Sequence, residues 1–302
     1  MTRGRIFKVL KWVGIALGGL VGVLVLLILV LFLIGGSRVN KTYDVTVAGV
    51  TVPTDAGAPA RGEHIVRSYG LCVECHGLKL EGELLDEDPV FGRIAPTNLT
   101  SGLGGIGGSY SDVDYVRAIR NGIGNDGKPL VIMPSNYFNK FSDQDLGDII
   151  AYLKSLPPVD NDLKETKLGV LGRIITLLDS EILPASVIDH EAPRPASPAK
   201  GVTKEYGEYL ATVCTACHGE HLSGGTLPGE GGDAPVAPNL THLAVSDWSE
   251  ADFGKAIQTG VTPFRKLDQE FMPWETLANL TDDEVTALWL YVSSLEPREY
   301  EK

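Results

Sequence analysis

Methionine and cysteine are both scarce in this chain of 302 residues, which has three methionines and four cysteines. Met1 begins the sequence, so Met133 and Met272 are the only others. The cysteines form two close pairs, and no cysteine stands outside them. None is left over for a disulfide framework of the kind that holds small secreted domains together. The few sulfur atoms are therefore candidates for a more specific role.

Charge is absent from Trp12 to Gly35, and acidic residues are absent from the first 41 positions. The uncharged run is long enough to span a bilayer as a helix. Basic residues precede it, and the positive-inside rule keeps such an end in the cytoplasm. A cleaved signal peptide has a similar start, but its apolar region is typically shorter. The sequence thus predicts a single-pass protein of the inner membrane, with a cytoplasmic segment at 1–11, an uncleaved transmembrane anchor at 12–35, a linker at 36–59 and a periplasmic or otherwise extracytoplasmic remainder.

Basic residues are outnumbered, with 26 Lys and Arg against 39 Asp and Glu and a net charge of −13. Because the N-terminal segment is basic, the predicted exported part is more acidic still. Such a surface disfavours nucleic acid, which binds basic patches. It would steer a basic protein partner toward the chain, although an acidic surface also serves solubility alone.

Each cysteine pair stands in the pattern Cys-x-x-Cys-His, first from Cys72 to His76 and again from Cys214 to His218. This pattern is the attachment signature of c-type haem. Two thiols about one helical turn apart bond the two vinyl groups of a porphyrin, and the adjacent imidazole binds its iron. A redox dithiol or half of a zinc site also uses Cys-x-x-Cys. Both alternatives leave the histidine unexplained, and the two pairs are too far apart in sequence for the usual zinc site.

A Met-Pro pair follows each motif at nearly the same distance. Methionine is a common second axial ligand of haem iron. Filling of an apolar core is its alternative role, but each half supplies one methionine and no spare. The sequence therefore predicts two covalently bound haems c. Their predicted ligands are Cys72, Cys75, His76 and Met133 in the first half and Cys214, Cys217, His218 and Met272 in the second.

The second half of the predicted exported part repeats the first well beyond these motifs. A short helical segment precedes each first cysteine, and an Ala-Pro pair follows each haem-binding histidine at identical spacing. A carbonyl of this loop is expected to accept the second N–H of the imidazole. A Ser-capped helix, the Met-Pro loop and a final amphipathic helix come next. The repeated positions are Gly62 and Gly207, Pro96 and Pro238, Ser111 and Ser249, Gly122 and Gly260, and Ser142 and Thr281.

Proline closes each repeat, which predicts two helical domains at 60–158 and 201–298. An interdomain linker at 159–200 joins them. It contains an apolar segment from Leu168 to Leu178 that is too short to span a bilayer. We expect this segment to pack at the domain interface rather than on the membrane surface. The predicted fold class is all-α.

The order of leading helix, Cys-x-x-Cys-His, proline loop, middle helix, methionine and capped final helix resembles the class I cytochrome c domain. The resemblance covers most of the predicted exported chain. It implies two tandem domains of that family after a transmembrane helix, with terminal helices that cross and a haem edge near the thioethers that exchanges electrons. It further implies a membrane-anchored diheme cytochrome c, an electron carrier and not an enzyme. Such a carrier relays electrons between a quinol-oxidising complex or dehydrogenase and a terminal acceptor, with redox proteins as partners.

Two other functions stay open. A diheme enzyme such as a peroxidase or thiosulfate dehydrogenase has similar tandem domains but needs an open or differently ligated iron. The spare histidines are interpreted as surface or packing residues: His64, His190, His221 and His242. A fixed subunit of a larger respiratory complex is the third possibility, since glycines at 14, 18 and 22 put small residues on one face of the anchor. The side chains expected near the haems are Tyr137, Phe138 and Trp274, with Arg93 or Arg265 at the propionates.

Overall fold

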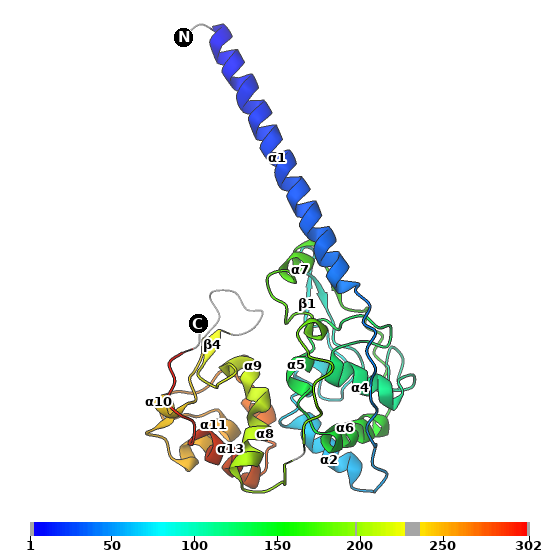
Figure 1. Cartoon of the computed structure of the whole chain (residues 1–302), viewed down its shortest axis with the longest axis vertical. Coiled ribbons are helices and arrows are strands. Elements are labelled where there is room, and N and C mark those ends of the chain that lie inside the picture. The colour runs from blue at the N-terminus through cyan, green and yellow to red at the C-terminus, as the bar shows by residue number, and fades with distance from the viewer. Residues whose placement is uncertain (1–2, 197, 227–235, 301–302) are drawn as a thin grey trace.

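The computed structural model of the chain describes residues 3–196, 198–226 and 236–300. One long helix, α1 (Arg3–Val39), stands clear of a globular part in which two helical units lie side by side (Figure 1). The first unit contains α2 (Ala58–Arg67), α3 (Val73–His76), β1 (Asp86–Asp88), β2 (Gly92–Ile94), α4 (Asp112–Asn121), α5 (Ser135–Phe138) and α6 (Asp143–Ser155). The second contains α8 (Lys204–Leu210), η2 (Ala211–Cys214), α9 (Thr215–His218), β4 (Gly225–Thr226), β5 (Val236–Ala237), α10 (His242–Val245), α11 (Glu250–Thr259), α12 (Trp274–Leu277) and α13 (Asp282–Val292). Between them in sequence come β3 (Lys167–Leu168), α7 (Val170–Ile175) and η1 (Pro184–Ser186).

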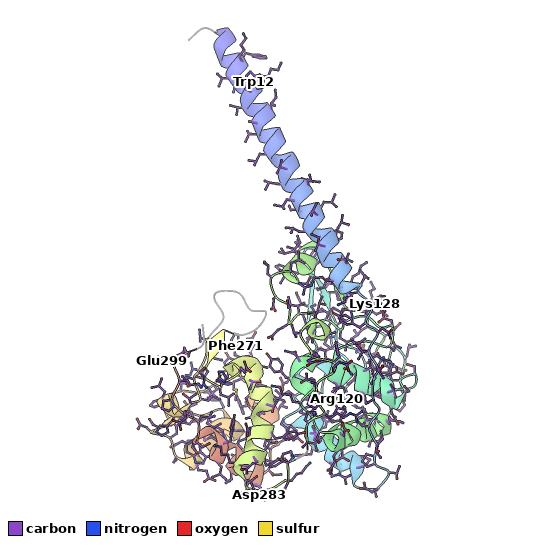
Figure 2. All side chains as sticks on the ribbon, viewed as in Figure 1. Trp12, Arg120, Lys128, Phe271, Asp283 and Glu299 are labelled. Atoms are coloured by element: carbon purple, nitrogen blue, oxygen red, sulfur yellow. The ribbon has the colours of Figure 1, made fainter. Side chains whose placement is uncertain are left out.

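Helix α1 agrees with the apolar helix expected near the N-terminus. Within the described residues it is long and apolar enough to cross a membrane from Phe7 to Val39, and none of its most apolar stretch is buried by the rest of the protein. Figure 2 shows its side chains projecting freely, with Trp12 toward the far end. The helix therefore presents its apolar surface outward along nearly its whole length.

The middle helix of each unit, α4 in the first and α11 in the second, begins at a polar cap and ends at a glycine. The side chains of Ser111 and Ser249 each accept the N–H of the acidic residue three positions on, and that carboxylate accepts the serine N–H in return. These reciprocal bonds satisfy N–H groups that have no partner inside a helix. Both helices end at a glycine in the left-handed conformation, Gly122 with φ 65° and Gly260 with φ 68°. The starts and ends predicted from the sequence are confirmed.

In each unit the first and last helices cross at a glycine. A Cβ placed on Gly62 of α2 would lie 2.6 Å from the carbonyl carbon of Asp148 in α6. A Cβ on Gly207 of α8 would lie 2.5 Å from the carbonyl carbon of Ala287 in α13. Carbon atoms in contact are normally about 3.5–4.0 Å apart, so the close approach depends on glycine. The helices bury apolar residues around these crossings, among them Ile65, Leu146, Ile149 and Ile150 in the first unit and Leu210, Val285, Leu288 and Val292 in the second.

The chain is mostly helical, as predicted, but it also has short strands that the sequence did not predict. The β1–β2 hairpin of the first unit is extended by β3 from the segment between the units, and all pairings are antiparallel. The apolar segment from Leu168 to Leu178 includes the end of β3 and all of α7. It packs against this hairpin and the end of α1. The expectation that it packs at the domain interface is therefore wrong. The N-terminal helix and the hairpin offer it an apolar surface that helix periodicity alone did not reveal.

The two units contact each other through acids at the starts of their last helices. The Tyr209 hydroxyl of the second unit donates to the Asp145 carboxylate of α6 (2.6 Å) and accepts from the Ser142 N–H (3.0 Å). In the other direction, Nε2 of His64 in α2 lies 2.9 Å from both carboxylate oxygens of Glu284 in α13. His64 and Tyr209 each stand two positions after the glycine of a helix crossing. The contact between the units is therefore close to reciprocal.

Candidate haem sites

Each histidine of the Cys-x-x-Cys-His motifs donates to one backbone carbonyl. His76 Nδ1 lies 2.7 Å from the Thr97 oxygen, and His218 Nδ1 lies 2.8 Å from the Pro238 oxygen. Because a carbonyl only accepts, Nδ1 carries the proton and Nε2 keeps a free lone pair for a metal ion. Burial lowers the pKa of both imidazoles, although the hydrogen bond to the carbonyl opposes this. Both are therefore neutral near neutral pH, the form that ligates iron.

An asparagine side chain fixes the loop that supplies this carbonyl. In the first unit, Asn98 Oδ1 accepts the N–H (2.9 Å) and the hydroxyl (2.8 Å) of Thr100, while Nδ2 donates to the Val159 oxygen (2.8 Å). Asn239 of the second unit makes the same set of bonds to the threonine two positions on and to the Arg298 oxygen. The loop is thereby tied to the segment that follows the last helix of its own unit.

The asparagine, rather than the proline, sets the register of the loop. The carbonyl that accepts from the histidine belongs to the residue immediately before the asparagine in both units. In the second unit this residue is Pro238, but in the first unit an extra Thr97 stands between Pro96 and the asparagine. The predicted loop therefore supplies the acceptor in both units, one residue later than the proline in the first.

The Met-Pro pairs form the same turn in both units. The Ser135 N–H donates to the Met133 oxygen at 2.7 Å, and the Trp274 N–H donates to the Met272 oxygen at 2.7 Å. A short helix follows at once, α5 in the first unit and α12 in the second. Both short helices lie against the middle helix of their own unit. The two methionines thus occupy equivalent places.

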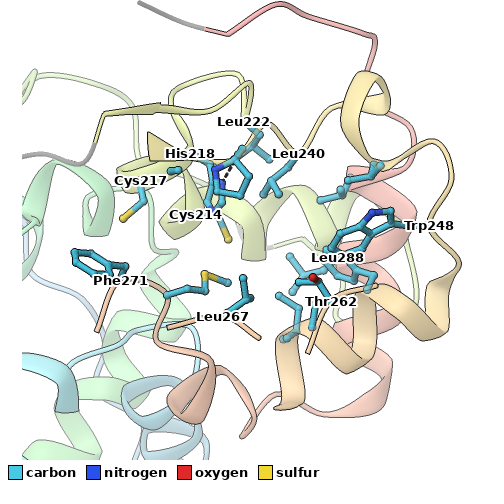
Figure 3. A pocket seen from close by; sticks show the side chains of 18 of the residues that line it. Cys214, Cys217, His218, Leu222, Leu240, Trp248, Thr262, Leu267, Phe271 and Leu288 are labelled. Carbon is cyan, nitrogen blue, oxygen red and sulfur yellow. Dashed lines mark hydrogen bonds between the residues drawn. The ribbon is translucent and has the colours of Figure 1, made fainter. Parts of the chain in front are cut away.

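In the second unit the motif and the methionine line one pocket (Figure 3). Cys214, Cys217 and His218 lie along one side of it, and Leu267 and Phe271 lie along the other. Met272 lines the same pocket. Most other lining side chains are apolar, and the polar ones are Thr262, Arg265, Lys266 and Asp268.

Buried polar atoms without a hydrogen-bond partner indicate whether the pocket suits a haem. Trp248 lines the pocket, and its buried Nε1–H has no hydrogen-bond partner among the described residues. The buried Tyr115 hydroxyl of the first unit is in the same state. Leaving a buried donor without a partner costs about 1–3 kcal/mol, which an acidic group bound nearby would offset. An apolar pocket with such a donor and basic Arg265 fits a ring that is apolar at its centre and carries propionates.

Comparison with known sequences agrees with this geometry. The profile of the cytochrome c family matches residues 60–157 and 205–296, which together are more than half of the chain. The chain belongs to the cytochrome c family. The predictions of an electron-transfer cytochrome and of covalently bound haem c are thereby confirmed, and the diheme-enzyme alternative is not favoured.

This cytochrome c chain is similar to cytochrome subunits of dehydrogenases. It is 26% identical over 295 residues to the cytochrome c subunit of alcohol dehydrogenase (quinone) from Gluconacetobacter polyoxogenes, with 83% of this chain and 59% of the relative covered. It is 27% identical over 268 residues to the gluconate 2-dehydrogenase cytochrome c subunit of Pantoea cypripedii, covering 78% of this chain and 59% of the relative. It is 26% identical over 271 residues to the fructose dehydrogenase cytochrome subunit of Gluconobacter japonicus, covering 81% of this chain and 55% of the relative. The chain therefore spans less than two thirds of the length of these relatives.

The thiol environments of this cytochrome c chain argue against the other uses of Cys-x-x-Cys. Burial raises the pKa of Cys72 and of Cys214 to about 12, and the second thiol of each pair adds to the effect. A dithiol oxidoreductase needs the opposite shift, because the thiolate is its nucleophile. A zinc site is not formed either, since no group of three or more His, Cys, Asp and Glu side chains in the described parts of the chain is placed to hold a metal ion.

Of the side chains expected near the haems, Arg265 lines the second pocket, whereas Arg93 pairs with Glu87 on the hairpin. The Lys266 ammonium nitrogen lies over the Trp274 ring, 3.7 Å from the ring centroid. The sequence interpretation missed Trp248, although a signal was present. This tryptophan stands directly before the capping serine of α11, as an aromatic residue also does before α4.

Proposed function

We propose that this cytochrome c chain holds two haems, one in each unit, and relays electrons between them. The proposed ligands are Cys72, Cys75, His76 and Met133 in the first unit and Cys214, Cys217, His218 and Met272 in the second. A bound haem supplies a one-electron carrier, and a His and Met axial pair raises its reduction potential. With both axial positions taken, no position is open for a substrate, so each unit would carry electrons without catalysing a reaction.

The observation that carries this proposal is the duplication of the site down to single hydrogen bonds. Each unit has a neutral imidazole whose Nδ1 is engaged and whose Nε2 is available. Each also has one methionine on the same proline turn. The diheme enzymes considered as the alternative need an open or differently ligated iron, whereas these two sites are equivalent in each of these contacts.

Contacts between the units support the relay. The Thr276 hydroxyl of α12 donates to the Glu74 carboxylate, which lies between the two cysteines of the first motif. In the other direction, α5 packs against η2, which ends at Cys214. Each methionine loop therefore lies against the haem-attachment segment of the other unit, which would bring the two thioether edges close together.

The membrane and partner assignments are part of the same proposal. Helix α1 would anchor the chain in the inner membrane with both units on the periplasmic side. The basic residues before the apolar run would keep the N-terminus on the cytoplasmic side. The relatives are named as subunits of dehydrogenases. We therefore propose that the chain accepts electrons from a membrane dehydrogenase or quinol-oxidising complex and passes them to a terminal acceptor.

The axial ligands are tested by two single substitutions, Met133→Leu and Met272→Leu, in the full-length protein in mild detergent. Haem content per chain is measured first, with two expected in the wild type and in both variants. The reduced wild type should bind no carbon monoxide, and each variant should bind one per chain, because leucine leaves one iron open. Carbon monoxide binding by the wild type would contradict the two-methionine assignment.

The partner assignment is tested by purification from the native membrane in mild detergent. A dehydrogenase subunit that co-purifies in a fixed ratio and reduces the chain when given its substrate is the expected result. Turnover of peroxide or thiosulfate by the isolated wild-type chain would instead favour the enzyme alternative.

A further inference from the structure

The segment between the two units is fastened to the point where α1 leaves the globular part. A Cβ on Gly35 of α1 would lie 2.7 Å from the carbonyl carbon of Arg173 in α7, so the two helices touch at this glycine. The Arg173 guanidinium lies 4.8 Å from the ring centroid of Phe32. Arg38 at the end of α1 donates to the Thr176 carbonyl. Helix α7 is therefore held against the last turns of α1.

The β1–β2 hairpin tip is bound to the same place. The Gly169 N–H donates to the Phe91 oxygen (2.8 Å), and the Leu171 N–H donates to the Val90 oxygen (3.0 Å). The tip itself is fixed by Asp88, whose Oδ1 accepts the N–H groups of both Val90 (2.7 Å) and Phe91 (2.8 Å). Figure 1 shows α7 and the hairpin together at the base of α1. The hairpin tip, α7 and the last turns of α1 are therefore joined to one another.

Four large apolar side chains of the hairpin tip, of α7 and of the turn after α7 are exposed. Val90 is 51% exposed, Phe91 46%, Val170 43% and Leu178 85%. We call these four residues the collar. Exposed apolar residues gathered around one point of the surface mark a contact with a partner or a membrane. The collar is continuous with α1, where Leu33 and Ile34 are also exposed.

The length of α1 sets the depth of the collar. A helix rises about 1.5 Å per residue, so a hydrocarbon layer of about 30 Å takes about 20 residues. Counted from Trp12, a residue type that favours the membrane interface, this layer ends near Phe32. Gly35, where α7 touches α1, then falls in the headgroup layer. Arg38 and Arg173 lie at the same level, where basic side chains meet lipid phosphates.

We propose that the collar rests in the boundary between lipid headgroups and acyl chains, on the outer face of the same membrane that α1 spans. Lipid is the occupant because the collar adjoins, through α7, the exit of a lipid-facing helix at the depth of the boundary. This inference rests on the proposed membrane anchoring, and it adds a second attachment beside the helix. With two attachments the first unit is held against the membrane at a fixed tilt, which α1 alone would not impose.

The test uses wild-type, full-length protein in phosphatidylcholine vesicles that contain a lipid with a photoreactive diazirine near the top of one acyl chain. After illumination, labelled peptides are mapped by mass spectrometry. Peptides that contain α1 and the collar should be labelled. Phe264 is the internal control, because it is 79% exposed but belongs to the second unit, whereas α1 adjoins the first unit and α7 (Figure 1). Its peptide should remain unlabelled.

A pair of matched variants sharpens the result. Leu178→Glu should reduce labelling of the peptide around α7 several-fold and leave the labelling of α1 unchanged. Leu243→Glu, at a residue that is 51% exposed in the second unit, should change neither. Collar labelling no higher than that of the Phe264 peptide, with α1 labelled, would overturn the collar proposal and point to a protein occupant. Absence of label from α1 itself would instead refute the membrane anchor.

Discussion

Replacing Gly207 by alanine puts the close crossing of α8 and α13 under direct test. The added Cβ would lie 2.5 Å from the carbonyl carbon of Ala287 and 3.0 Å from Cβ of Tyr291. Since contacting carbon atoms are normally about 3.5–4.0 Å apart, the helices would have to separate by about 1 Å. The obstructing atoms belong to the backbone and to a Cβ, so no side-chain rotation relieves the clash.

Two opposing contributions decide the size of the effect. Overpacking of a core costs typically 1–3 kcal/mol, and a rigid obstacle places this site at about 3 kcal/mol. Alanine favours a helix over glycine by about 1 kcal/mol. The net expectation is a destabilisation of about 2 kcal/mol, which for two units of roughly 200 residues that unfold together lowers the melting temperature by about 4–8 °C.

The assay is thermal unfolding of the full-length holoprotein in mild detergent, followed by circular dichroism. Gly254→Ala is the matched control, because this glycine lies inside α11 and its added Cβ would meet Val285 Cγ1 at 3.5 Å, an ordinary contact. The control should be unchanged or stabilised by up to about 1 kcal/mol. The reasoning is refuted if Gly207→Ala unfolds at or above the temperature of this control.

Three further outcomes follow from the structure. Ser249→Ala removes the side-chain bonds of the serine in the α11 capping box. It should lower the free energy of unfolding by about 1 kcal/mol in a denaturant titration, more than the control Ser246→Ala at the end of α10. Tyr209→Phe removes a bond to a carboxylate and leaves the Ser142 N–H without an acceptor, so it should destabilise the folded protein by about 2 kcal/mol. Burial raises the pKa of Glu284, but the His64 and Thr281 hydrogen bonds outweigh this and lower it below 4.5. Stability from this carboxylate is therefore complete above about pH 4.5 and is lost as the pH falls through the lowered value, so acid should reduce the difference in melting temperature between wild type and Glu284→Gln.

Features that depend on a few neighbouring residues could be predicted from the sequence. The serine caps of α4 and α11 and the glycines that end them are examples, because each helix end is set by residues within one turn. The loop that supplies the carbonyl for each histidine could also be predicted, although the residue that carries this carbonyl could not. The extra Thr97 hid the final register, since the asparagine that sets it bonds to Val159, far along the chain.

Features that depend on distant segments could not be predicted. His64 was interpreted as a surface or packing residue, and nothing near it in sequence identifies Glu284 as its partner. Leu168 to Leu178 has an apolar pattern that fits several burial sites equally. Its place became definite only with the fold, because Gly35 and the hairpin tip are the surfaces that accept it. An apolar periodicity predicts that one face of a segment is buried. It does not predict which other segment packs against that face.

The two last helices show why the units behave as one body. Glu284 completes its own capping box by accepting the Thr281 N–H, and it also meets His64 of the first unit. The α6 helix lacks that return bond, since its Asp145 carboxylate accepts the Tyr209 hydroxyl of the second unit, which in turn accepts the N–H left free at the start of α6. Separating the units would therefore expose a helix end as well as an interface. A relay between two sites depends on a fixed distance between them, and a cap shared across the interface is one physical means of fixing it.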